Sequence, residues 1–425
     1  MDTIFALASG RGKAGVAVYR LSGPLSGPAL ATLSGKALPP PRRAVRVRLA
    51  DIDEGLALWF PAPASFTGED VVELHLHGGR AVASALAEAL LALGLRPAEA
   101  GEFSRRAVLA GKLDLTRAEG IADLVEAETA AQRRQALAQM GGALEALVEG
   151  WRARLVRALA LVEAAIDFAD EGIGDAEIEQ AREIAAGLAG EMAAALADGR
   201  RGERLRDGFH VAILGAPNAG KSSLLNRLAG REAAIVSATA GTTRDVIEVH
   251  LDLGGWPVTV ADTAGLRDGA CAIEAEGVRR ALARAEAADL KLVVFESGRA
   301  PDAASLALVD GDTLVVRNKC DLGGDGPGLA VSAASGEGFD ALLAAIEAEV
   351  SARLEGAGAA PFTRQRHRAA AAECRAALAR FLDGGAVELA AEDLRLAGRA
   401  LGRITGRIDV EELLDVVFRD FCIGK

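Results

Sequence analysis

Residues 215–222 form a glycine-rich turn, GAPNAGKS, between an apolar run at 210–214 and a helical pattern at 222–228. A turn that leaves a strand and opens a helix is the context of the GxxxxGK[ST] phosphate-binding loop. Its glycines allow backbone N–H groups to surround a phosphate, and the helix N-terminus adds its positive end. Lys221 is expected to neutralise β- and γ-phosphate oxygens, and the Ser222 hydroxyl to bind Mg²⁺. This part of the chain is therefore predicted to be a parallel sheet covered by helices.

Three further motifs follow the loop in an order typical of guanine-nucleotide switches. Asp262 ends an apolar run and begins the string DTAG, where a carboxylate can hold Mg²⁺ through water. The string NKCD at 318–321 follows another run, and the Asp321 carboxylate can accept both N–H groups on guanine's Watson–Crick edge. Ser332 and Ala333 follow the last run, where a backbone N–H can reach guanine O6. Because each motif lies at the carboxyl end of a strand, the sequence predicts a GTP or GDP site there.

Hydrolysis needs a water-positioning group that these motifs do not supply. Ras-type GTPases place a Gln directly after DxxG, but Leu266 stands there and cannot hydrogen-bond to water. Glu274, nine residues after Gly265, is the candidate, and a solvated acid near the start of a helix is an equally good interpretation. Asn218 and the carbonyl oxygens of residues 237–242 can hold a monovalent cation. A K⁺ ion there would take the place of an arginine finger.

The motifs together predict one nucleotide site. Thr243 is the expected second Mg²⁺ ligand beside Ser222, and Lys221 and Asp262 are expected to act in catalysis. The residues predicted to contact nucleotide or cation are Asn218, Ala219, Gly220, Lys221, Ser222, Ser223, Ser237, Ala238, Thr239, Ala240, Gly241, Thr242, Thr243, Asp262, Thr263, Ala264, Gly265, Asn318, Lys319, Asp321, Ser332 and Ala333.

The residue patterns on either side of the predicted α/β unit differ from those within it. The first 120 residues mix short β patterns with an Ala/Leu helix at 81–93 that Gly94 closes. From 118 to 200 long helices are expected, with an apolar stripe at three- and four-residue steps, and helices return after the Gly/Ala-rich segment 355–360. The predicted strands are 16–21, 56–60, 71–76, 210–214, 258–261, 290–295, 314–317 and 329–332, and the predicted α/β-unit helices are 222–228, 276–286 and 339–350.

Composition narrows the protein class further. The chain has 425 residues, 50% apolar, with a net charge of −12, which favours several globular domains over a basic nucleic-acid coat. No apolar run approaches the roughly 20 residues that span a bilayer, and the four scattered cysteines make no disulfide framework. We expect a soluble, reduced, cytoplasmic protein.

Several strings outside the α/β unit make the chain resemble the MnmE (TrmE) family of bacterial tRNA uridine-5-carboxymethylaminomethyl modification GTPases. They are TI at 3–4, GKAGVAVYRLSG at 12–23, SFTGEDVVEL at 65–74, GEFSRRA at 101–107, GKLDL at 111–115 and the terminus FCIGK at 421–425. The resemblance covers essentially the whole chain, although Gly10 and Arg11 stand where the family usually has two prolines.

The resemblance implies a multidomain α/β and α architecture. Residues 1–117 would form an N-terminal α+β domain that binds formyltetrahydrofolate and dimerises. A discontinuous helical domain, 118–202 and 356–425, would be interrupted by an inserted Ras-like P-loop G domain at 203–355.

The resemblance also implies site residues outside the nucleotide motifs. Arg20, Glu73, Lys112 and Lys425 would contact 5-formyltetrahydrofolate, with Arg or Lys suited to the carboxylates of the folate tail and Glu73 to the pterin N–H edge. Asn218, Ser237, Thr239 and Thr242 would bind K⁺, and Glu274 would orient water. Cys422 falls on the family's C-terminal cysteine, and its thiol is as consistent with a nucleophile as with packing.

The implied activity is GTP hydrolysis coupled to modification of carbon 5 of the wobble uridine of tRNA. The implied partners are a second copy of the chain and the FAD-containing MnmG, with tRNA as substrate. Two alternatives remain open: a ribosome-assembly switch, which shares the P-loop Asn218 and the DTAGL string, and a dimerisation switch without folate binding. The C-terminal helices show no β-rich KH-like segment of the kind that an assembly switch would carry.

Overall fold

The computed structural model describes residues 2–10, 12–167, 175–231, 233–235, 248–262, 288–384, 386–407, 414, 417–418, 421–422 and 424. The chain divides into two compact units. The first comprises Met1–Ala122, Gln139–Ala185 and Ala376–Lys425, and the second comprises Asp123–Ala138 and Ala186–Arg375. No helix within the described ranges is both long and apolar enough to cross a membrane.

An N-terminal sheet of six strands opens the first unit, in the order β3-β4-β5-β2-β1-β6. Its pairs are antiparallel except for β1 with β6. The bounds are β1 Ile4–Leu7, β2 Ala17–Ser22, β3 Val45–Leu49, β4 Asp53–Phe60, β5 Val71–Leu76 and β6 Arg96–Pro97, with helices α1 Ser26–Ser34, α2 Arg80–Ala92 and α3 Glu102–Leu109.

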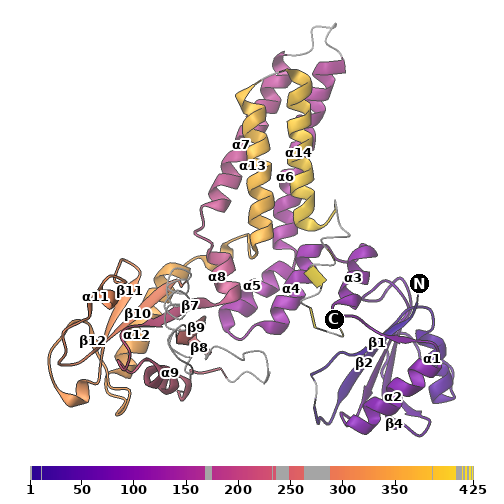
Figure 1. The fold of residues 1–425 in the computed structure, drawn as a ribbon. Coiled ribbons are helices and arrows are strands. Elements are labelled where there is room, and N and C mark those ends of the chain that lie inside the picture. The colour runs from indigo at the N-terminus through magenta and orange to yellow at the C-terminus, as the bar shows by residue number, and fades with distance from the viewer. Residues whose placement is uncertain are drawn as a thin grey trace, which may run out of the picture. The chain divides into compact units, whose positions relative to one another are not determined.

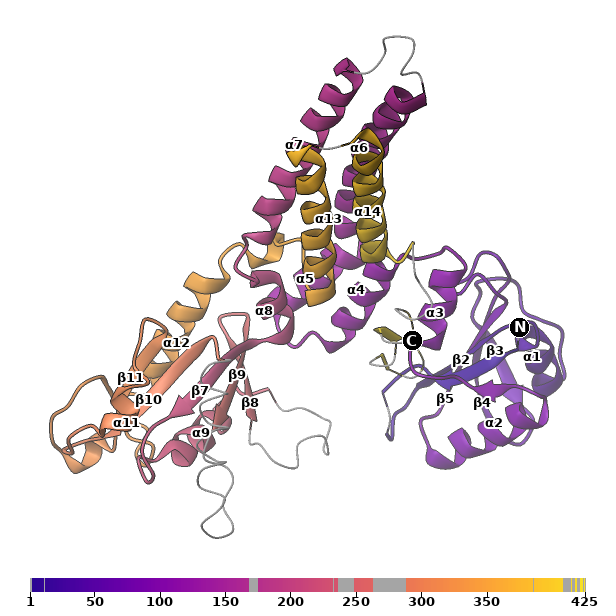
Figure 2. The same cartoon turned by 45° about the horizontal axis from the view of Figure 1, so that its top comes forward.

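Apolar and polar side chains alternate along these strands, so one face of the sheet is apolar. Tyr19, Leu21, Trp59 and Leu74 are buried there with residues of α1 and α2, which lie on that side of the sheet (Figure 2). The three predicted strands are confirmed, and the predicted helix 81–93 is α2, which ends before Gly94 at φ +85°. The sequence patterns did not predict β1, β3 or β6.

Seven further helices, most of them long, follow the sheet among the described residues. They are α4 Leu115–Glu126, α5 Ala130–Met140, α6 Ala143–Asp167, α7 Asp175–Leu196, α8 Arg201–Asp207, α13 Gln365–Asp383 and α14 Val387–Thr405. The predicted stripe on α6 is buried at Leu144, Val148, Trp151, Leu155 and Val162. Helices α6 and α14 lie side by side although more than 200 residues separate them in sequence (Figure 1).

The second unit contains the predicted α/β layer, a six-stranded sheet in the order β12-β11-β10-β7-β9-β8. All pairs are parallel except β8 with β9. The bounds are β7 Phe209–Leu214, β8 Glu248–Leu253, β9 Trp256–Asp262, β10 Leu290–Glu296, β11 Thr313–Asn318 and β12 Leu329–Ala330, with helices α9 Lys221–Ala229, α11 Ala303–Leu306 and α12 Phe339–Leu354 and short 3₁₀ turns at Cys320–Leu322 and Ala357–Ala359.

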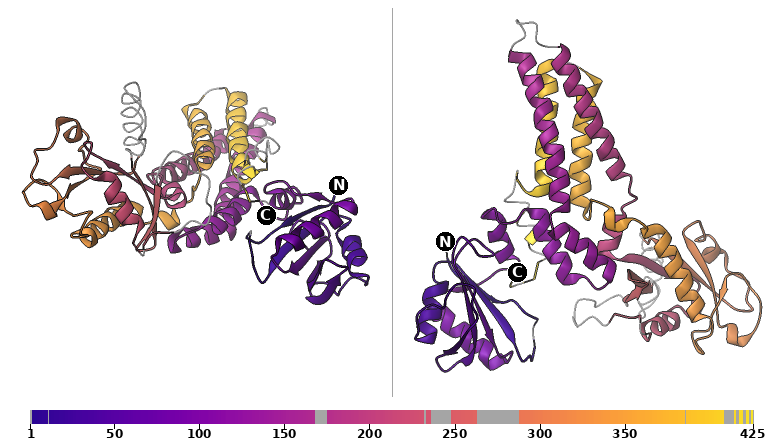
Figure 3. Two further views of the ribbon diagram at one scale, coloured as in Figure 1. Left: turned by 60° about the horizontal axis from the view of Figure 1, so that its bottom comes forward. Right: turned by 180° about the vertical axis from the view of Figure 1, so that it is seen from behind.

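Two apolar cores flank this sheet. On one face Leu224 and Leu228 of α9 and Ile346 of α12 pack on β7, β9 and β10, and α12 runs beside the strands (Figure 3). The opposite face buries Leu214 and Phe295. The expected fold class, an N-terminal α+β domain and helices interrupted by a P-loop domain, is confirmed. Edge strand β8 was not predicted, and the predicted helix 276–286 lies outside the described residues.

Candidate functional site

The phosphate loop runs from the end of β7 to the start of α9, and its glycines are required where they stand. Gly215 has φ +141°, and a Cβ there would lie 2.3 Å from the Val294 carbonyl oxygen. Gly220 has φ +90°, and a Cβ there would lie 2.2 Å from Nδ2 of Asn318. Asn218 is exposed at φ +68°, a left-handed conformation that asparagine tolerates. The chain therefore turns tightly enough to present its backbone N–H groups to a phosphate.

Lys221 lies inside the loop rather than in solvent. It is 8% exposed, and its ammonium donates to the carbonyl oxygens of Gly215 and Ala216, both at 2.8 Å. Burial lowers the pKa of Lys221, and the charge of Asp262 partly opposes that effect. A positive group is thus fixed where β- and γ-phosphate oxygens would bind.

Two predicted Mg²⁺ groups meet at the edge of the loop. The Ser222 hydroxyl donates to Oδ2 of Asp262 at 2.6 Å, and Asp262 ends β9 at 1% exposure. A hydroxyl and a carboxylate are the hard oxygen donors that suit Mg²⁺. The donor chemistry of these two residues therefore fits the ion that the sequence implies.

The base-recognition motif is tied directly to the phosphate loop. Asn318 is 1% exposed, donates from Nδ2 to the Ala219 carbonyl oxygen at 2.9 Å, and accepts from the Ala333 N–H at 3.1 Å. Asp321 is exposed in the 3₁₀ turn, so its carboxylate is open to a ligand. One buried amide therefore holds three of the predicted nucleotide segments together.

Lys319 has a partner that the sequence motifs did not identify. It adopts φ +65°, and its ammonium lies 3.0 Å from Oε1 of Glu296, whose other carboxylate oxygen is 3.1 Å from Arg299. Glu296 is the last residue of β10 and pairs in register with Asn318. The signal available in the sequence was only an acidic residue at the end of the apolar run 290–295.

Some predicted site residues lie outside the described residues. They are Ser237, Ala238, Thr239, Ala240, Gly241, Thr242 and Thr243, then Thr263, Ala264, Gly265 and Glu274, and finally Lys425.

In the N-terminal sheet, two predicted folate-site residues bind one another. Arg20 and Glu73 are direct cross-strand partners on β2 and β5, and Nε and Nη2 of Arg20 donate to Oε1 of Glu73 at 3.0 and 2.9 Å. Lys112 is exposed, and its stem passes Gly68, where a Cβ would lie 3.4 Å from Cε of Lys112. Within the described part of the chain no hydrogen bond joins Lys112 to the pair.

The C-terminal end lies against the N-terminal sheet within the first unit. The Cys422 carbonyl oxygen accepts from the Gly101 N–H at 3.3 Å, and the Cys422 side chain is exposed rather than packed. A Cβ on Gly424 would lie 2.3 Å from the Leu7 carbonyl oxygen. The chain therefore brings the residue before Lys425 to the end of β1.

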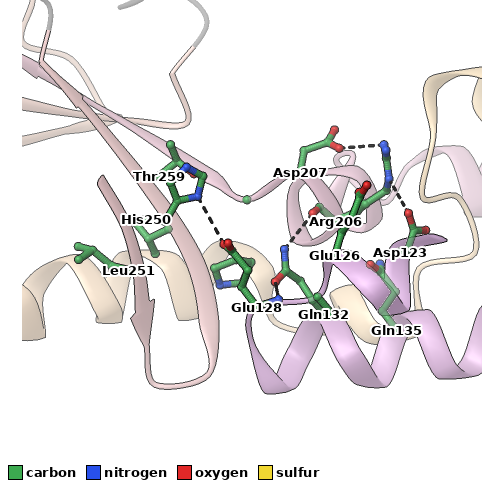
Figure 4. A pocket seen from close by; sticks show the side chains of 14 residues that line it. Asp123, Glu126, Glu128, Gln132, Gln135, Arg206, Asp207, His250, Leu251 and Thr259 are labelled. Carbon is green, nitrogen blue, oxygen red and sulfur yellow. Dashed lines mark hydrogen bonds and ion pairs between the residues drawn. The ribbon is translucent and has the colours of Figure 1, made fainter. Parts of the chain in front are cut away.

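A cavity of about 320 Å³ lies in the second unit beside the β8–β9 hairpin, α5 and α8 (Figure 4). Several of its side chains contact one another: Arg206 lies 3.1 Å from Asp123 and 2.8 Å from Asp207, and Nδ1 of His250 lies 3.5 Å from Oε2 of Glu128. These contacts join the β8–β9 hairpin to the helices at the cavity.

The phosphate loop, the Mg²⁺ donors and the guanine motif lie together at the carboxyl ends of parallel strands. Together they define a GTP-binding P-loop protein. The family models described as "MnmE helical domain" and "GTP-binding protein TrmE N-terminus" match residues 115–422 and 3–112. The chain belongs to the MnmE/TrmE family of tRNA modification GTPases.

Curated relatives are similar in sequence to this chain over its full length. A tRNA modification GTPase MnmE from Paramagnetospirillum magneticum is 65% identical over 439 residues and covers 100% of both chains. Proteins of the same name from Parvibaculum lavamentivorans and Rhodospirillum rubrum are 60% and 56% identical, again over 100% of both chains. The predicted class, a GTPase of tRNA modification, is confirmed, and this family membership decides against the assembly-switch alternative.

Proposed function

We propose that this chain is a K⁺-dependent GTP hydrolase that acts with the FAD-containing MnmG. Together they would add a (carboxymethyl)aminomethyl-type group to carbon 5 of the wobble uridine of certain tRNAs, using a folate one-carbon unit. The observation that carries the hydrolase part is the Ser222–Asp262 contact of 2.6 Å beside the buried ammonium of Lys221. The cytoplasm is the expected location.

In this proposal the described residues bind and orient GTP. Lys221 neutralises the β/γ-phosphate oxygens, and Ser222 with Asp262 holds Mg²⁺, which supplies charge neutralisation when bound. Asp321 accepts from the guanine N–H groups, and Asn318 keeps that motif against the loop. These contacts fix the phosphates while leaving the attacking water to other residues.

The water and cation roles rest on the resemblance. Glu274 would orient the attacking water, Thr243 would add a Mg²⁺ ligand, and Ser237, Thr239 and Thr242 would complete a K⁺ site with Asn218. Asn218 is exposed on the phosphate loop. This position supports a role in cation binding, because its amide oxygen can turn toward a cation beside the phosphates.

A folate site on the N-terminal sheet is the second part of the proposal. Because Arg20 and Glu73 share a hydrogen bond, both would face the same part of the ligand. Glu73 would accept from the pterin N–H edge while Arg20 donates to its carbonyl oxygen, and Lys112 and Lys425 would hold the tail carboxylates. The exposed thiol of Cys422 is the candidate nucleophile.

The open sheet face supports a homodimer. Opposite the helices, Val18, Leu58 and Phe60 are half-buried, and Leu56 is 42% exposed. Apolar side chains exposed together on one face of a sheet favour cover by a second protein surface. A second copy of this chain is the proposed occupant, and with MnmG it would form a heterotetramer.

Calorimetric titration of 5-formyltetrahydrofolate into the full chain and into a chain lacking Lys425 tests the folate part. Binding that weakens on the deletion is expected, because Gly424, the residue before Lys425, lies at the end of β1. Absence of binding to either chain would refute the one-carbon assignment and leave the GTPase.

GTP turnover in K⁺ and in Na⁺ at equal ionic strength tests the cation part. The expected result is faster turnover in K⁺ and a large loss in Glu274→Ala with nucleotide binding retained. Equal rates in the two salts would remove the K⁺ site, and wild-type turnover by Glu274→Ala would remove that residue from the mechanism.

A further inference from the structure

The guanidinium of Arg20 is enclosed on more than one side. Its central carbon lies 5.4 Å from the ring centroid of Phe66 and 5.7 Å from that of Phe103. Its Nε and Nη2 edge is hydrogen-bonded to Glu73. Arginine over an aromatic ring is attracted by the ring quadrupole within about 6 Å. Two rings and one carboxylate therefore determine the plane of this guanidinium.

The strand register explains why the rings reach Arg20. On the other side of β2 the partner of Arg20 is Ala6, a small residue on the same sheet face. Phe103 of α3 is fully buried and packs with Ile4, Ala6 and Ala98, and Phe66 covers the same cluster. The two rings therefore cover one end of this sheet face and lie next to the guanidinium of Arg20.

Polar contacts anchor both ring-bearing segments to β2. The hydroxyls of Ser22 and Thr67 lie 2.7 Å apart, and Ser22 donates to Oε2 of Glu69 at 2.6 Å. Arg106 of α3 contacts Glu69 at 3.0 Å and Glu102 at 2.9 Å. The loop that carries Phe66 and the helix that carries Phe103 are therefore fixed two residues beyond Arg20.

We propose that Phe66 and Phe103 are positioning residues of the folate site, which we name the Arg20 clamp. The clamp holds the guanidinium so that its Nη1 edge donates to a carbonyl oxygen of the ligand while Glu73 accepts from the adjacent N–H groups. The ligand class is a heterocycle with neighbouring amide N–H and C=O groups, as in a pterin. This inference rests on the proposed folate binding.

The enclosure also sets a limit on the ligand. Because the rings occupy space over the guanidinium, a ligand ring cannot stack on that side and must meet Arg20 edge-on. Edge-on contact depends on the orientation of the guanidinium plane. Replacing one of the two aromatic rings with an aliphatic side chain should therefore weaken ligand binding even when the apolar volume is kept.

Phe66 is the position to vary, because Phe103 is fully buried and its variants can fail to fold. Affinity for 5-formyltetrahydrofolate is measured calorimetrically for wild type, Phe66→Leu and Phe66→Tyr. Phe5→Leu is the matched control, since Phe5 lies on the opposite, helix-covered face of the same sheet and no ring–cation contact is found for it within the described ranges. Thermal unfolding of each variant checks the fold.

Phe66→Leu is expected to weaken binding about 3- to 20-fold, the range of a partly desolvated cation–π contact. Phe66→Tyr keeps the ring face and should bind within about twofold of wild type, as should a folded Phe5→Leu variant. Wild-type affinity in a folded Phe66→Leu variant would overturn the clamp, and so would equal losses in Phe66→Leu and Phe66→Tyr. Failure of the wild type to bind would instead refute the folate proposal on which the clamp rests.

Discussion

Replacing Asn318 with alanine should destabilise the nucleotide-free protein as well as abolish guanine binding. The buried amide bonds the Ala219 carbonyl oxygen at 2.9 Å and the Ala333 N–H at 3.1 Å. The variant Asn318→Ala leaves both backbone groups without this partner at a site that is 1% exposed in the wild type. The phosphate loop and the 332–333 loop would then lose their common anchor.

The expected loss follows from the two hydrogen bonds. Each is worth about 0.5–1.5 kcal/mol net, and a buried group left unsatisfied costs about 1–3 kcal/mol. With partial relief by an entering water, the free energy of unfolding should fall by about 2–4 kcal/mol. For a unit of this size that is a decrease in Tm of about 4–16 °C.

Differential scanning calorimetry of the full chain without nucleotide measures this decrease. Asp321→Ala is the matched control, because it lies in the same motif with an exposed carboxylate and should lose guanine affinity while keeping its Tm within about 2 °C. Nucleotide affinity alone cannot separate the two variants. A Tm for Asn318→Ala equal to that of Asp321→Ala would refute the anchoring role of the amide.

Three other outcomes are expected. Burial lowers the pKa of Lys221 in the free protein, and bound phosphate should raise that pKa, so GTP binding at alkaline pH should take up protons. Calorimetry in buffers of different ionisation enthalpy measures this uptake, and a binding enthalpy that does not depend on the buffer would contradict it. Burial raises the pKa of Cys374 to about 12, so iodoacetamide at neutral pH should label exposed Cys422 and spare Cys374, as peptide mass spectrometry can show. Glu296→Gln removes the charged partner of Lys319 and should speed release of a fluorescent GDP analogue about 2- to 5-fold; an unchanged release rate would exclude an effect of this pair on the base site.

The nucleotide site could be predicted from sequence because its parts are locally encoded. A strand, a glycine-rich turn and a helix start are contiguous at 215–222, and the parallel sheet brings the other strand ends to the same edge. The sequence could not show that Asn318 bonds Ala219, because this contact joins residues 99 positions apart. Edge strand β8 was missed although the signal was present: its sequence, EVHLDL, alternates polar residues with the buried Val249, Leu251 and Leu253, the pattern of a half-buried strand.

The N-terminal site was harder to predict because its geometry depends on register. Nothing in the local sequence states that Arg20 lies opposite Glu73 or that Ala6 leaves room for two rings. The resemblance supplied Arg20 and Glu73 as separate ligand contacts, whereas the fold pairs them at 2.9 Å. Cross-strand pairing changes with a shift of one residue, so such contacts need the observed sheet.

Strand β9 connects the nucleotide site to the helices of the second unit. Asp262 at its end bonds Ser222, while the turn before its start accepts a hydrogen bond at Gly255 from the Ala131 N–H of α5 at 3.2 Å. Ala131 is 4% exposed and belongs to the core of the α/β layer. Because a strand inside a sheet resists stretching and bending, a displacement of Asp262 along β9 must be taken up either by its neighbouring strands or by α5.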